Sequence, residues 1–216
     1  LKTTYLELIV MLVLAGLLKY FCDPRCSVIC IILLVLWVTF LKNKKYIPAK
    51  LRDSKWIHGI FRWTCLAIPY FFAGFMILVS RFYNPENPIL SRLNHLITYR
   101  LSLGYEAFSN YDSTWFGQYI ELIGNGGTTV KSDKYNFIDC SYLNIWLCFG
   151  FFVFITLLIM LSYLMFKNWS NTLFLGFIVL ICLHSVIEHH LFEFRYNFMV
   201  LLPLAMFKLS AVKRTA

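Results

Sequence analysis

The chain has 216 residues, of which 59% are hydrophobic and 14% are charged, and its formal net charge at pH 7 is +9. A soluble globular domain averages about a quarter charged residues, so the composition excludes that class and indicates an integral membrane protein. The positive charge does not point to nucleic acid, because the lysines cluster between apolar runs, where cations act as topology signals. The seven cysteines are odd in number and lack metal-site spacing, so we interpret them as small residues buried in the membrane.

The first part of the chain predicts three membrane spans, at residues 5–21, 27–41 and 56–80. Apolar runs of this kind approach the length of about 20 residues that crosses a hydrocarbon core. The loop between the second and third runs is strongly basic, which places it in the cytoplasm by the positive-inside rule. Its cations are Lys42, Lys44, Lys45, Lys50, Arg52 and Lys55.

Residues 81–142 form the only long polar segment between apolar runs, and the third span delivers them to the outer face. Asn87-Pro88 predicts a helix start, because Asn caps helices and Pro suits their first position. Apolar residues then recur at helical spacing as far as Gly104, which predicts one amphipathic helix in the outer interface. Residues 115–123 predict a second, shorter amphipathic stretch.

The last part of the chain predicts three more spans, at residues 142–166, 172–187 and 198–212, with a short outer turn at 188–197. The last two runs are short, so a re-entrant hairpin stays an alternative. Terminal cations fall on the same side as the first basic cluster. The predicted fold class is therefore all-α, a polytopic transmembrane helical bundle of about six spans with a long extracellular loop that contains amphipathic interfacial helices. Both termini are cytoplasmic.

The predicted organisation has three parts. They are the N-terminal spans (1–80), the extracellular loop (81–142) and the C-terminal spans (143–216).

Ionisable residues near the outer face are candidate functional groups. His184, Glu188 and Arg195 share one face if the fifth span continues as a helix, and such a cluster at a membrane is either functional or a snorkelling cap. The run Glu188-His189-His190 also suggests a metal, but adjacent histidines on a helix point to different faces, so we predict no metal site.

Arginines on the outer loop suggest anion binding, since guanidinium grips phosphate oxygens in pairs. Contact with lipid headgroups is the alternative for Arg92 and Arg100.

Four ordered stretches carry a resemblance to a known family: residues 93–108, then Phe116-Gly117-Gln118, then 135–150, and finally 185–197. Together they resemble the Wzy-like repeat-unit polymerases of Gram-positive capsular polysaccharides and exopolysaccharides, which are polymerases of the O-antigen type. The commonest family form has Ser-Gly-Arg where this chain has Thr98-Tyr99-Arg100, and its Asp-Ser-Ser-Tyr-Leu appears here as residues 139–143. Family members usually have ten or more spans, so we expect this chain to be the C-terminal half.

The resemblance implies a glycosyltransferase of the outer face of the cell membrane. Such an enzyme takes a glycan from undecaprenyl diphosphate and joins it to the next lipid-linked repeat unit, and we expect no metal or other cofactor. Expected partners are the undecaprenyl-diphosphate-linked oligosaccharide, the lipid bilayer, and a flippase and chain-length regulator. Two rivals stay open: a polysaccharide ligase of the same superfamily, and a non-catalytic membrane transport or assembly protein, since broken spans around charges also occur in transporters.

Candidate site residues fall into three groups. Arginines stabilise the diphosphate leaving group, and the candidates are Arg100, Arg195 and Arg92. A base removes the proton of the acceptor hydroxyl, and Glu188, His189 and Asp139 stay unranked candidates for that role. Tyr105 and Tyr142 are candidates for stacking on sugar, with an interface-belt role as the alternative.

Overall fold

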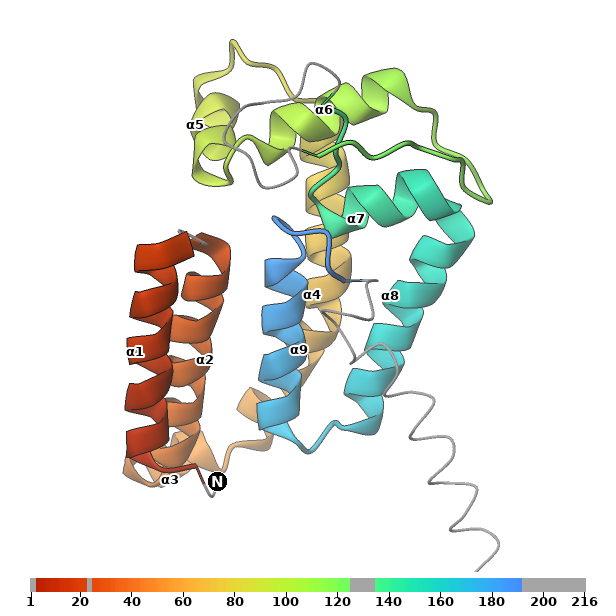
Figure 1. Ribbon diagram of the computed structural model, residues 1–216. Coiled ribbons are helices and arrows are strands. Elements are labelled where there is room, and N and C mark those ends of the chain that lie inside the picture. Colours follow the sequence, from red (N-terminus) through yellow and green to blue (C-terminus); the bar gives the residue numbers. More distant parts are fainter. Residues whose placement is uncertain (1–2, 23–24, 125–134, 192–216) are drawn as a thin grey trace, which may run out of the picture. The chain divides into compact units, whose positions relative to one another are not determined.

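The computed structural model describes residues 3–22, 25–124 and 135–191 (Figure 1). Within these ranges the regular secondary structure is helical, apart from an isolated antiparallel bridge between Ile123 and Asn136. Three helical stretches are long and apolar enough to cross a membrane: Arg25–Lys42, Lys55–Arg81 and Ser141–Lys167. The expected membrane class is thus supported, while the six spans and their orientation stay predictions.

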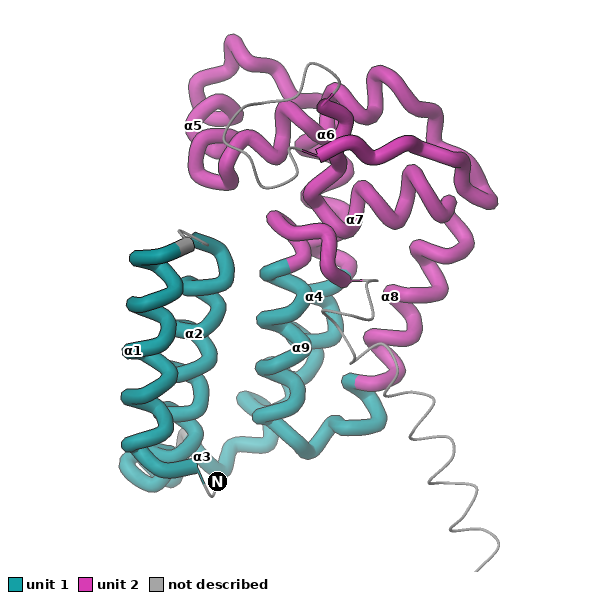
Figure 2. Tube along the Cα trace, viewed as in Figure 1, with its two compact units in different colours: residues 1–69, 165–184 teal, residues 70–164, 185–216 magenta. Residues whose placement is uncertain are grey.

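The contacts divide the chain into two compact units (Figure 2). Unit 1 comprises Leu1–Pro69 and Met165–His184, and unit 2 comprises Tyr70–Leu164 and Ser185–Ala216. The long helix α4 (Lys55–Arg81) contributes to both units. The three-part division predicted from the sequence follows membrane topology, which these units do not test.

Unit 1 is built on the helix pair α1 (Tyr5–Cys22) and α2 (Arg25–Lys42), which matches the first two predicted runs. Leu8, Val35 and Val38 form its buried core. The basic loop that follows holds a 3-10 turn (Lys44–Tyr46) and the short helix α3 (Ala49–Arg52). Most other apolar side chains of α1 and α2 are exposed, as helices facing lipid require.

Helix α9 (Thr172–His184) packs against α2 in the same unit. It ends at His184, whose ring lies 3.2 Å from the Ser27 hydroxyl. Residues 185–191 continue as a turn, so the helical continuation on which the shared face of His184 and Glu188 depended is not present. Arg195 and the sixth apolar run lie outside the described residues.

In unit 2, Tyr70 of α4 contacts α8 (Gly150–Lys167). Tyr70 links the two helices, since its hydroxyl donates to the Leu158 carbonyl and accepts from the Ser162 hydroxyl at 2.9 Å. Such a bridge satisfies polar groups inside an otherwise apolar helix contact.

The predicted single interfacial helix is in fact two helices, α5 (Pro88–Leu96) and α6 (Arg100–Asn110). The start of α5 is confirmed, because the Asn87 side chain accepts from the backbone N–H groups of Ile89 and Leu90. Between the helices, Thr98 and Tyr99 adopt φ angles of 55° and 65°. Left-handed backbone cannot continue an α-helix, so the chain turns there.

The predicted amphipathic stretch at residues 115–123 is not helical. Its backbone instead pairs with the bend of the fourth predicted span. That span begins as α7 (Ser141–Asn144) and a π-helical turn (Ile145–Phe149), and it changes direction at Gly150, which has a φ of 86° (Figure 1). The backbone carbonyls of Thr114 and Trp115 accept from the first N–H groups of α8, those of Phe151 and Phe152. The extended stretch therefore caps α8.

Candidate functional site

A buried ion pair joins two of the predicted site residues. The Arg100 Nη1 atom lies 2.9 Å from the Asp139 Oδ2 atom, and the two side chains are 19% and 12% exposed. The Arg100 Nε–H also donates to the backbone carbonyl of Ile187 at 3.0 Å. These contacts bring together helix α6, the segment before α7 and the turn after α9, which are far apart in the sequence.

The turn before Arg100 is held by Asn94, a buried residue of α5. Its side-chain carbonyl accepts from the backbone N–H groups of Leu101 and Ser102 at 3.0 and 3.1 Å, and its amide donates to the Tyr83 hydroxyl. Asn94 therefore caps the N-terminus of α6, because Tyr99 at the N-cap position makes no side-chain hydrogen bond to it. The sequence reasoning missed it, although a polar residue among the buried positions of an amphipathic helix was a usable signal.

The pKa of Asp139 is raised above its ordinary value. Burial is the largest cause, the nearby charge of Arg100 opposes it, and the charge of Glu188 adds to it. The charge of His189 lowers the pKa of Asp139, as does a hydrogen bond from the Tyr135 hydroxyl, which lies 3.5 Å from the carboxylate. Asp139, Arg100, Glu188 and His189 therefore form one electrostatic cluster, which we call the charged cluster.

Ser141 fastens residues 185–191 to the start of α7. Its backbone N–H donates to the Ser185 carbonyl at 3.0 Å, its hydroxyl donates to the Glu188 carbonyl, and its Oγ atom accepts from the Leu191 N–H at 3.1 Å. Ser141 has no exposed surface. One buried serine thus fixes the backbone on both sides of Glu188 and His189.

Glu188, His189 and His190 lie close enough together to be considered as metal ligands. Each offers one ligand atom, and these atoms lie within 4.8 Å of one another. The Glu188 Oε2 atom is 3.9 Å from the His190 Nε2 atom. The sequence argument against a metal assumed a helix here, and that assumption is wrong, because the residues lie in a turn. The absence of a metal site stays a prediction.

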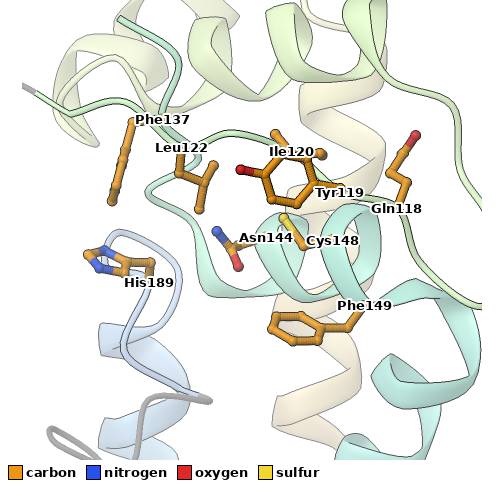
Figure 3. A pocket seen from close by; sticks show the side chains of 9 residues that line it. All are labelled: Gln118, Tyr119, Ile120, Leu122, Phe137, Asn144, Cys148, Phe149 and His189. Carbon is orange, nitrogen blue, oxygen red and sulfur yellow. The ribbon is translucent and has the colours of Figure 1, made fainter.

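A cavity of about 450 Å³ lies beside the charged cluster. Figure 3 shows the side chains that line it. His189 belongs to both, and its ring meets the Phe137 ring edge to face at 4.8 Å. Aromatic and apolar side chains share the lining with several polar groups. The lining residues are Gln118, Tyr119, Ile120, Leu122, Phe137, Asn144, Cys148, Phe149 and His189.

The other predicted site residues lie elsewhere. Arg92 is exposed on α5, where the described part of the chain gives it no ion-pair partner, and Tyr105 is half-exposed with its ring 6.3 Å from that of Tyr83. Tyr142 is fully buried, so its ring presents no face to a sugar, and we drop it from the candidates. Arg195 lies outside the described residues.

The structure adds aromatic residues that the sequence reasoning did not select, Tyr119, Phe137 and Phe149. Phe137 precedes the candidate Asp139 by two positions, and this closeness was the one sequence signal that Phe137 lies near the site. The other two reach the cavity only through the pairing of residues 115–123 with the bend at Gly150, which no local pattern encodes.

Comparison of the chain with models of protein families, with curated proteins and with solved structures finds no match.

Proposed function

We propose that this chain belongs to a membrane glycosyltransferase that joins oligosaccharide repeat units carried on undecaprenyl diphosphate, at the outer face of the cytoplasmic membrane. The observation that carries the proposal is the charged cluster beside a cavity. An arginine, two carboxylates and a histidine converge there from three segments of the chain. The same segments contain the stretches that resemble the Wzy-like polymerases.

In the proposed reaction, the bond between the donor sugar C1 atom and the diphosphate oxygen breaks, and undecaprenyl diphosphate leaves. The acceptor hydroxyl oxygen forms the new bond to C1, and its proton passes to a base on the protein. Arg100 stabilises the charge on the leaving group, because a guanidinium held by backbone carbonyls in a partly dry site keeps its charge and its direction.

The structure favours a division of roles among the three candidate bases. Asp139 is engaged by Arg100, so we assign it to positioning that arginine. His189 lines the cavity in which an acceptor would lie, and histidine is the side chain that most often transfers protons in enzymes. We therefore propose His189 as the base and Glu188 as the neighbouring charge that stabilises the imidazolium formed when the proton arrives.

A polysaccharide ligase would use the same donor chemistry with a different acceptor. A transport or assembly protein would not need a base beside a cavity, and its charged residues are expected in mid-span. In this chain the charged cluster comes from segments outside the long apolar helices, which favours the enzyme over the transporter.

The test is a matched pair of substitutions in the gene that contains this chain. Arg100→Lys keeps the charge and loses the paired geometry, so long polymer should fall at least tenfold while single repeat units accumulate on lipid. Arg92→Lys changes the same residue type at an exposed position of the neighbouring helix and should leave the chain length unchanged. Equal polymer in both variants, with both proteins inserted in the membrane, contradicts the proposed site.

The proposed orientation has its own test. A cysteine placed at Glu86 should react with an impermeant thiol reagent on intact cells, and one at Lys45 only after permeabilisation. The reverse pattern would place the charged cluster on the cytoplasmic side, opposite to the face at which the proposed reaction takes place, and would contradict the proposed function.

A further inference from the structure

We propose that the cavity beside the charged cluster binds one neutral pyranose ring, the terminal sugar of the acceptor glycan, and that Asn144 anchors it. This deepens the proposed function and rests on it for the identity of the acceptor. The cavity holds about 450 Å³, which lies in the range of about 300–1,000 Å³ that small-molecule sites occupy.

The lining offers both surfaces that a sugar needs. A pyranose presents a face of C–H groups and an edge of hydroxyl groups, so a sugar site combines flat aromatic rings with fixed polar atoms. Tyr119 and Phe149 are 90% and 42% exposed as residues, and Phe137 stands across the cavity from them (Figure 3). Phenylalanine and tyrosine rings give contact area at little cost in conformational entropy.

Asn144 supplies the fixed polar atom. Its side chain is only 9% exposed, and its amide donates to the backbone carbonyl of Ile138 at 3.3 Å. No donor from the described part of the chain reaches the Asn144 side-chain carbonyl. That oxygen belongs to a residue lining the cavity, so a sugar hydroxyl that donates to it would satisfy it.

A hydrocarbon chain is the main competing occupant, since the aromatic rings would also suit a prenyl group. Five of the nine lining residues carry polar or polarisable groups: Gln118, Tyr119, Asn144, Cys148 and His189. Filling the cavity with hydrocarbon would take the Asn144 carbonyl out of water without a partner, which is unfavourable. His189 belongs both to the cavity lining and to the charged cluster, so a hydroxyl of the bound ring would lie beside the proposed base.

The alkylation rate of Cys148 measures whether a ligand occupies the cavity, because Cys148 lines the cavity and is partly exposed. The full chain would be treated with N-ethylmaleimide in lipid nanodiscs, and the alkylation of each cysteine followed by mass spectrometry. The probes are methyl glycosides of glucose, galactose, rhamnose and N-acetylglucosamine at millimolar concentrations, with farnesol as the prenyl probe. Cys30, partly exposed on α2 in unit 1, is the internal control.

At least one methyl glycoside should slow the alkylation of Cys148 threefold or more and leave Cys30 unchanged. Asn144→Ala should lose that protection, and Asn110→Ala, an exposed asparagine at the end of α6, should keep it. Failure of every glycoside, protection by farnesol alone, or full protection in Asn144→Ala overturns the proposal. An unliganded alkylation rate of Cys148 that is equal in the variant and in wild type shows that the cavity is folded in the variant.

The binding assay requires no turnover, so its result separates this inference from the proposed function. Glycoside protection combined with normal polymer in a gene deletion would keep the sugar site and reject the polymerase. Loss of polymer in the deletion without any glycoside protection would keep the polymerase and reject the sugar site.

Discussion

Replacing Ser141 with alanine should release residues 185–191 without disturbing the Arg100–Asp139 ion pair. The change removes one hydroxyl that both donates to the Glu188 carbonyl and accepts from the Leu191 N–H. A buried hydrogen-bonding group left without a partner costs about 1–3 kcal/mol, so we expect a local loss of about 2–3 kcal/mol. At 1.4 kcal/mol per factor of ten, the turn should open about 30- to 150-fold more often.

Amide hydrogen exchange on the full chain in nanodiscs measures that opening directly. Peptides covering residues 185–191 should exchange faster in Ser141→Ala, while those covering α5 and α6 should not change. Ser109→Ala is the matched control, because the Ser109 hydroxyl donates to the Tyr105 carbonyl at an exposed site on α6. Such a change usually stays within about 0.5 kcal/mol. Equal exchange of residues 185–191 in wild type and Ser141→Ala would refute the idea that this serine holds the turn.

Three further substitutions test the fold. Gly150→Ala should cost about 3 kcal/mol or more and lower the thermal midpoint of unfolding, because a Cβ atom there would lie 2.6 Å from the Trp115 carbonyl at a positive φ. Thr98→Asn should gain about 1 kcal/mol in the same assay, since asparagine tolerates the left-handed backbone that a β-branched residue does not. Gly176→Ala should cost about 1–3 kcal/mol, because its Cβ atom would meet Trp37, which is stacked between Phe40 and Phe61.

The sequence predicted the helices whose signals are local. Long apolar runs defined α1, α2 and α4 to within one or two residues, and Asn87-Pro88 marked the start of α5. Each of these signals depends on residues close in the chain, where spacing and capping chemistry act directly.

The missed features depend on tertiary contacts. Neither Thr98 nor Tyr99 favours a left-handed turn, and the turn exists because Asn94 supplies hydrogen bonds from the preceding helix. A glycine in place of Tyr99 would have indicated it. The bend at Gly150 lies inside a continuous apolar run, so hydropathy predicts a straight span across it. Only the backbone contacts with residues 114–118 show why the run bends.

The structure brings some of the predicted site residues together and leaves others apart. Arg100, Asp139, Glu188 and His189 lie in one electrostatic cluster, and their role in a site stays a prediction. Tyr142 was chosen as an aromatic ring near that segment, but it faces the core. Which side of a short helix a ring occupies depends on the packing of distant elements, which a local pattern does not fix.

The charge of the cluster constrains how a diphosphate could bind. Its described members include one arginine against two carboxylates, Asp139 and Glu188, so a dianionic leaving group would meet an unfavourable field unless a proton is taken up. Asp139 is the group that would take up this proton, because burial and the charge of Glu188 raise its pKa, although the charge of Arg100 lowers it. Protonating Asp139 would remove one negative charge and release Arg100 to the diphosphate.

Binding of the diphosphate should therefore be linked to protonation of Asp139. An anion beside the carboxyl raises its pKa still more, so affinity should fall as the pH rises through that range, by up to about tenfold per pH unit for one proton. The inhibition constant of undecaprenyl diphosphate, measured in the polymerisation assay over a pH series, gives the slope. Asp139→Asn removes this proton but leaves the titration of the ligand itself, so its slope should be shallower than that of wild type. Identical slopes would mean that Asp139 stays ionised throughout and that Arg100 binds the diphosphate, if at all, without leaving its partner.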